Sequence, residues 1–149
     1  MYQKVLVPVD GSLPSMRAVD TARQLVEEGS AKEVTLLHVT LNPRDVILVE
    51  GFYTRLDFPA FQEELMEKVN EIAKEILDKA LERMGPRIAA IARVENGPAA
   101  DTICEIAEKE HFDLIVIGHR GLNRLQRFLI GSVSGKVTSH ARCSVLVVK

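Results

Sequence analysis

The residues best suited to chemistry follow a short apolar run, residues 113–117, near the C-terminal end of the sequence. They form the stretch GHRGLNRLQRFLIGSVSGK, residues 118–136, which is rich in glycine and basic side chains and contains no acidic residue. Glycine lets the backbone approach a ligand closely because it has no Cβ. Free main-chain amides at the start of a helix, together with positive charge, are typical of phosphate sites. The stretch therefore indicates a binding segment for a polyphosphate, with a purely structural turn as the alternative.

Serine and glycine have separate tasks in this interpretation. We expect the last helix to begin at Gly131 and Ser132, with Ser132 as the N-cap. The hydroxyls of Ser132 and Ser134 would add hydrogen-bond donors for the anion. Gly118 and Gly121 would allow a sharp turn after the preceding strand.

Two familiar phosphate motifs do not fit. A Walker A loop needs four residues between its glycines and Ser or Thr directly after its Lys. Here three residues separate Gly131 from Gly135, and Val137 follows Lys136. The sequence also lacks GxGxxG, so a dinucleotide site of the usual type is not supported. The residues alone therefore indicate an anion at a helix N-terminus, without naming it.

The net charge of −2 conceals a strong asymmetry along the chain. All 21 acidic residues lie at or before Asp113, and six of the 19 basic residues follow it. Residues 1–113 therefore carry 13 − 21 = −8 and the last 36 carry +6. Such segregation favours an anionic partner near the C-terminal third. Nucleic acid is not favoured, because the patch is small and holds one aromatic residue, Phe128, where single-strand binders interleave several.

Strand and helix patterns alternate along the chain and position this segment. We expect strands at residues 4–9, 33–39, 87–94, 113–118 and 144–149. Helical patterns lie between them: after Asp10-Gly11-Ser12, over about 61–84, after Gly97-Pro98, where the proline sits in the first turn, and from Gly131. This order predicts a single α/β domain over residues 1–149, with a parallel sheet covered by helices on both faces.

The candidate segment and the first turn of the chain share a position in this fold. Ligands of such sheets bind beyond the carboxyl ends of the strands, where the strand order reverses. Asp10 and Gly118 both lie at such ends, and they share one crevice if the first and fourth strands are neighbours. Residues 40–58 are irregular and indicate a lid or a partner-contacting loop. Alternatively, the aromatic residues Phe52, Tyr53 and Phe58 pack beneath as a satellite cluster.

Composition limits the compartment. The chain of 149 residues has no apolar run near the ~20 residues that span a bilayer. We expect a strand within the first residues and therefore no signal peptide. Cys104 and Cys143 form no CxxC pair, and no His/Cys spacing suits zinc. We expect buried, reduced thiols in a cytoplasmic protein.

The glycine spacing carries a family resemblance. Gly118-x2-Gly121-x9-Gly131-Ser132 resembles the G-2x-G-9x-G-[ST] signature of the ATP-binding branch of the universal stress protein family. The resemblance continues through VLVPVDGS, LLHV, VENGPAADTICEIAEKEHFDLIVIGHRG and CSVLVV, with Ser144 where proline is common. It implies an adenine nucleotide alpha hydrolase-like fold with a doubly wound, five-stranded parallel sheet in the order 3-2-1-4-5. It also implies ATP as ligand, with Mg²⁺ or Mn²⁺ held through phosphate oxygens.

The resemblance further implies which residues surround each part of the nucleotide. At the base and ribose these are Pro8, Val9, Asp10, Val39, Gly97, Ile117 and Gly118. At the phosphates they are Gly121, Gly131, Ser132, Val133 and Ser134. Val39 would hold adenine through its main chain, and Asp10 would reach the ribose or the metal's water shell while also closing a turn. No residue is expected to be catalytic or to bind metal directly, and His119 and Arg120 receive no role.

The last strand, residues 144–149, is apolar on both faces. At the edge of a sheet its open main-chain groups would invite aggregation. The resemblance implies that it pairs antiparallel with its twin across a two-fold axis, giving a homodimer. The alternative is a loop that covers the edge.

Three functions follow from these expectations. The leading hypothesis is an ATP-binding switch or sensor in the stress response, with slow or no turnover. The second is a metal-dependent ATP hydrolase, which needs an oriented water and a base, with His119 or Asp10 nearest. The third is a nucleotide-free dimer that acts through its surfaces, which the intact glycine signature disfavours.

Overall fold

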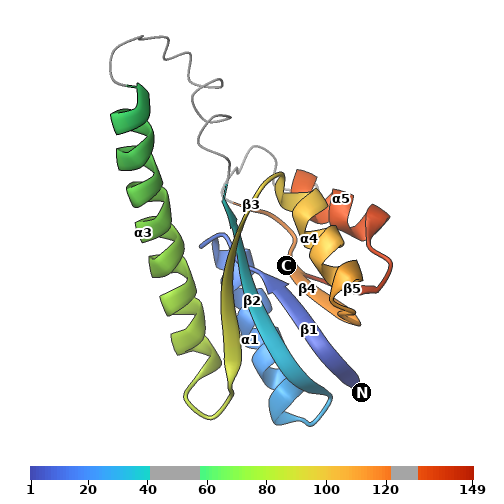
Figure 1. Ribbon diagram of the computed structural model, residues 1–149. Coiled ribbons are helices and arrows are strands. Elements are labelled where there is room, and N and C mark those ends of the chain that lie inside the picture. Colours follow the sequence, from blue (N-terminus) through green and yellow to red (C-terminus); the bar gives the residue numbers. More distant parts are fainter. Residues whose placement is uncertain (41–57, 122–130) are drawn as a thin grey trace.

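Five parallel strands form one sheet in the order β3-β2-β1-β4-β5 (Figure 1). The computed structural model describes residues 1–40, 58–121 and 131–149. The strands are β1 (Tyr2–Pro8), β2 (Ala31–Thr40), β3 (Ala90–Asn96), β4 (Leu114–Gly118) and β5 (Ser144–Val148). The helices are α1 (Leu13–Glu27), α3 (Phe58–Met84), α4 (Ala99–Lys109) and α5 (Ser132–His140). This topology confirms the predicted fold and strand order.

Helices cover both faces of the sheet. Helices α1 and α3 pack on one face, and α4 and α5 pack on the other (Figure 1). The central strand β1 sends Val5 and Val7 into the first core and Leu6 into the second, and all three are fully buried. A strand buried on both faces needs apolar residues at consecutive positions, which explains the apolar run KVLVPV.

The third strand lies later in the sequence than predicted. We expected residues 87–94, whereas β3 spans Ala90–Asn96. The Ile88 amide donates to the Gly85 carbonyl at 3.4 Å, and the Ala90 amide donates to the Ile88 carbonyl at 3.0 Å. These bonds hold the preceding residues in a turn, so pairing with β2 starts only at Ala90. Apolar content alone could not separate this turn from the strand.

The first turn of the chain is tightly built, and it places β1 and α1 beside the candidate segment. Ser12 is the N-cap of α1, and its Oγ accepts from the Ser15 amide at 3.3 Å. The Ser12 hydroxyl also donates to the main-chain carbonyl of Arg120 at 3.4 Å. The beginning of α1 is therefore held against the residues that follow β4.

Two further expectations are only partly covered by the described residues. No helix in residues 1–40, 58–121 or 131–149 is both long and apolar enough to cross a bilayer. Most of the irregular segment predicted at 40–58, with Phe52 and Tyr53, lies outside the described residues, and Phe58 begins α3.

Candidate functional site

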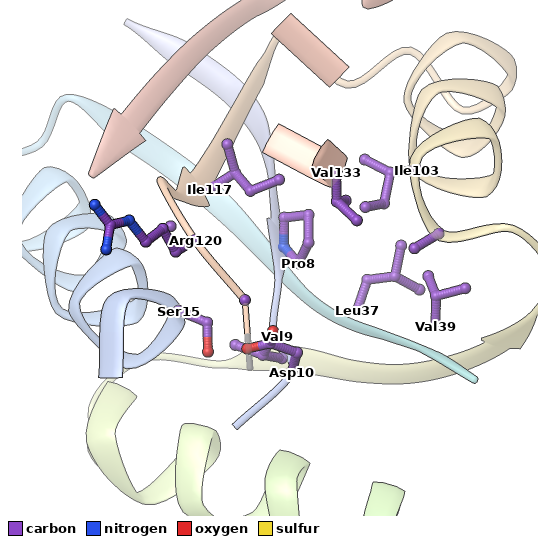
Figure 2. Close-up of a pocket in the computed structure, with 13 residues that line it drawn as sticks. Pro8, Val9, Asp10, Ser15, Leu37, Val39, Ile103, Ile117, Arg120 and Val133 are labelled. Atoms are coloured by element: carbon purple, nitrogen blue, oxygen red, sulfur yellow. The ribbon is translucent and has the colours of Figure 1, made fainter. Parts of the chain in front are cut away.

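A cavity of about 170 Å³ opens beyond the carboxyl ends of β1 and β4 (Figure 2). The chain runs from β1 to β2 on one side and β4 lies on the other, so this is the switch point of the strand order. The volume is below the roughly 300–1,000 Å³ of clefts that enclose drug-sized ligands, so part of a nucleotide-sized ligand would extend past its mouth. The lining residues are Pro8, Val9, Asp10, Ser15, Leu37, Val39, Ala99, Ile103, Ile117, Gly118, Arg120, Gly121 and Val133.

One wall of the cleft is apolar. Leu37 and Val39 line it together because alternate residues of β2 point to the same face. Ala99 and Ile103 lie one turn apart on α4 and also line the cleft. In Figure 2, Ile103 lies across from Leu37 and Val39, and Val133 borders this wall at the start of α5. Such a wall suits a flat, weakly polar group such as a nucleobase.

Asp10 provides the carboxylate of the lining. Its Oδ1 accepts from the Ser12 amide at 2.9 Å, which closes the turn that was expected. Its Oδ2 lies toward Gly121, where an added Cβ would stand 2.6 Å away. No group of three His, Cys, Asp or Glu residues that could hold a metal occurs among the described residues.

The first two signature glycines allow close packing. Neither Gly118 nor Gly121 has a positive φ, so the turn expected after β4 does not depend on a left-handed glycine. A Cβ at Gly118 would lie 2.6 Å from the main-chain carbon of Pro14 and 2.7 Å from the amide nitrogen of Ser15. Gly118 therefore lets the end of β4 pack on the first turn of α1. In the same way, the missing side chain of Gly121 leaves space for the Asp10 carboxylate.

The start of α5 is fastened to the main chain of His119. The carbonyl of His119 accepts from the Gly131 amide at 2.7 Å and from the Ser134 Oγ at 2.8 Å. Ser134 is only 2% exposed, so its hydroxyl is already used inside the protein. The N-cap is Gly131 and not Ser132 as predicted, and no side chain caps the helix. A Cβ at Gly131 would lie 3.2 Å from the same carbonyl, so this glycine also serves close packing.

Two helix starts converge on the cleft. The first amides of an α-helix have no partner within the helix and carry the positive end of its dipole. Val133 in the first turn of α5 and Ala99 at the start of α4 both line the cavity. Pro98 was expected within the first turn of α4, but it is the N-cap of this helix. It makes no side-chain hydrogen bond to the first amides. The cleft therefore combines an apolar wall with a mouth that favours negative charge.

Comparison with known proteins agrees with this architecture. The model of the universal stress protein family matches residues 1–149. The chain belongs to the universal stress protein family. It is similar to universal stress protein YxiE of Bacillus subtilis, with 33% identity over 152 aligned positions that cover 100% of both chains.

Solved structures of the family share the fold. The structure of MJ0577, a universal stress protein of Methanocaldococcus jannaschii, has a TM-score of 0.79 and 32% identity, covering 100% of this chain and 96% of the other. A universal stress protein solved in complex with cAMP has a TM-score of 0.68 and 28% identity, covering 99% and 97%. Both likenesses extend over the whole sheet and its helices.

The structure brings together most of the residues that the family signature predicted. Eight of the twelve line the cavity: Pro8, Val9, Asp10, Val39, Ile117, Gly118, Gly121 and Val133. The other four do not line it: Gly97, Gly131, Ser132 and Ser134. Gly97 instead has a φ of 141°, and its amide donates to the Thr40 carbonyl at 3.0 Å. His119, weighed as a base, is also outside the lining, and its Nδ1 is buried without a partner among the described residues.

Five lining residues of this universal stress protein were not predicted. They are Ser15, Leu37, Ala99, Ile103 and Arg120. The alternation of β2 could have revealed Leu37 from Val39. Ala99 and Ile103 lie one turn apart in the helix that was expected after Gly97-Pro98, but neither was expected at the site. Ser15 and Arg120 carried no signal, since both depend on how α1 meets the end of β4. In Figure 2 the guanidinium of Arg120 points away from the apolar wall.

Two basic side chains of the C-terminal third already have acidic partners. Lys136 pairs with Asp101 at 2.8 Å, and Arg142 pairs with Glu108 at 2.7 Å. Both acids lie on α4. Folding therefore pairs these cations with acidic residues that are distant from them in the sequence. Two further basic residues, Arg124 and Arg127, lie outside the described residues.

Proposed function

We propose that this universal stress protein binds an adenine nucleotide in the cleft, with ATP as the expected ligand. It would act as a nucleotide-dependent switch or sensor in the stress response, with slow or no turnover. The observation that carries the proposal is the convergence of Asp10, Gly118, Gly121 and the start of α5 on one cavity at the switch point of the sheet. The complex of a 28% identical universal stress protein with cAMP supports it.

The two ends of the cleft suit the two ends of a nucleotide. The base would lie against the apolar wall of Leu37, Val39 and Ile103, and the phosphates would extend toward Val133 and the first amides of α5. Mg²⁺ or Mn²⁺ would neutralise the phosphate charge and would be held through phosphate oxygens. Asp10, whose Oδ2 lies opposite Gly121, would contact the ribose or the water shell of that ion.

A charge at Val133 tests this placement. Val133 lines the cavity, is 38% exposed and lies in the first turn of α5. Val133→Glu would set a carboxylate against the phosphates, where unit charges ~4 Å apart at a protein surface repel by about 4 kcal/mol. We expect at least a tenfold loss of ATP affinity by calorimetry. The same acid favours the helix dipole, so the melting temperature should be unchanged or higher.

Val133→Gln is the matched control, because it has the same shape without the charge. It should bind ATP more tightly than Val133→Glu, and the two variants should bind adenosine alike, since adenosine has no phosphate. Equal ATP affinity in both variants would contradict a phosphate site at α5. Failure of the wild type to bind any adenine nucleotide would refute the function, and rapid release of ADP would favour the hydrolase instead.

We further propose a homodimer through residues 144–149. In the described sheet β5 pairs with β4 alone, so its other edge offers main-chain donors and acceptors. Leu146, in the middle of β5, is 39% exposed. Antiparallel pairing of two such edges around a two-fold axis would satisfy these groups and cover Leu146.

The two edges of the sheet provide a controlled test of the dimer. Leu146→Glu places a charge at the centre of the proposed interface and should give a monomer in light scattering at micromolar concentration. Ile91→Glu makes a similar change on β3, the opposite edge, where Ile91 is 60% exposed. This variant should remain a dimer. A monomeric wild type, or a dimer lost only in Ile91→Glu, would contradict the assignment to β5.

A further inference from the structure

His38 holds a peptide of the cleft that lies beyond the end of its strand. Strand β1 ends at Pro8, yet the next residue, Val9, remains attached to β2. Its amide donates to the Leu37 carbonyl at 2.8 Å, and its carbonyl lies 2.7 Å from His38 Nδ1. The side chain of His38 therefore supplies the bond that a longer ladder would have provided.

The chemistry of this contact determines the protonation of the ring. A carbonyl oxygen only accepts hydrogen bonds, so Nδ1 of His38 must carry the proton. The neutral ring is then the Nδ1–H tautomer, with Nε2 unprotonated. Val9 is 3% exposed, so without His38 its carbonyl would lack a partner away from bulk water.

The bond also sets the direction of Asp10. The Val9 carbonyl belongs to the planar peptide that joins Val9 to Asp10, and no peptide of the described residues is cis. In a trans peptide the C=O and the next N–H point in opposite directions. The Val9 carbonyl is bonded on the β2 side, so the Asp10 amide points toward the β4 side. That is also the side on which Gly121 meets the Asp10 carboxylate.

We propose that His38, as the Nδ1–H tautomer, is a positioning residue of the nucleotide cleft. It acts through Val9 and Asp10 and does not touch the ligand: alternation along β2 places its side chain on the opposite face from Leu37 and Val39, which line the cavity. This role rests on the proposed function, because it concerns the affinity of that same site.

A pair of variants separates the hydrogen bond from the ring. His38→Phe keeps an aromatic ring without a donor, and we expect about a tenfold loss of affinity for Mg-ATP, or about 1.4 kcal/mol. His38→Asn keeps an N–H two bonds from Cβ, as Nδ1 is, and should bind within about threefold of the wild type. Nitrogen-15 NMR should show the neutral His38 ring protonated at Nδ1.

His140→Phe is the matched control. His140 Nδ1 also lies 2.9 Å from a main-chain carbonyl, that of Lys136, but at the far end of α5 from the cleft. This variant should bind Mg-ATP as the wild type does. The proposal is overturned if His38→Phe keeps wild-type affinity, if His38→Asn binds as weakly as His38→Phe, or if the neutral ring is protonated at Nε2. If the wild type binds no adenine nucleotide, the proposed function fails together with the role of His38. If the wild type binds but the variants behave as just described, only the role of His38 fails.

Discussion

Replacing Gly118 with alanine tests whether the end of β4 needs to lie directly on α1. The new Cβ would stand 2.6 Å from the main-chain carbon of Pro14 and 2.7 Å from the amide nitrogen of Ser15. Ordinary contact begins at 3.4 Å, so the first turn of α1 would have to retreat by 3.4 − 2.6 = 0.8 Å. Both obstructing atoms belong to the backbone and cannot rotate away.

The cost follows from this overlap. Overpacking typically destabilises a protein by about 1–3 kcal/mol, and we expect the upper value, because a helix start would have to move. In a chain of 149 residues, about 3 kcal/mol corresponds to a melting temperature roughly 6–12 °C lower. Urea unfolding followed by circular dichroism would measure it as a lower midpoint with an unchanged slope.

Gly29→Ala is the control for conformational strain alone. Gly29 has a φ of 72° and no heavy atom within 4 Å of an added Cβ. Alanine there costs only the left-handed backbone, about 1 kcal/mol. If Gly118→Ala loses no more free energy of unfolding than Gly29→Ala, the close approach of β4 and α1 is not a constraint, and the packing role of the first signature glycine is wrong.

Three further outcomes follow from single contacts. Gly121→Ala would place a Cβ 2.6 Å from the Asp10 carboxylate, so it should weaken nucleotide binding several-fold. In an Asp10→Ala background the same change should have no further effect, and additive losses in calorimetry would contradict this. Ser134→Ala removes a buried hydroxyl that donates to a main-chain carbonyl at 2.8 Å, so it should cost about 1 kcal/mol of stability, and an unchanged melting temperature would count against that bond. Burial raises the pKa of Cys104 and Cys143, so at pH 8 fewer thiolates are present than in a free cysteine. Their reaction with Ellman's reagent should therefore reach half its maximal rate at a higher pH than that of glutathione, and a lower midpoint would refute the shift.

The linear pattern identified most elements but not all of their limits. The consecutive apolar residues of β1 indicate a strand buried on both faces, as Val5, Leu6 and Val7 are. The turn before β3 was mistaken for strand because its residues are equally apolar, and only its main-chain bonds to Gly85 and Ile88 distinguish it. Strand order did not follow from the pattern; it came from the family resemblance carried by the glycine spacing.

The sequence by itself determined the alternating elements, the spacing of the signature glycines and the position of Asp10 at a strand end, because these depend on neighbours along the chain. Only the tertiary structure decided which polar groups remain available to a ligand. The carbonyl of His119 accepts hydrogen bonds from the Gly131 amide and the Ser134 hydroxyl, and the Val9 carbonyl accepts one from His38. The partners in each of these bonds lie 12 to 29 positions apart, and each donor or acceptor so used is lost to a ligand. No local pattern reports such a pairing, because it exists only after the strands and helices have packed.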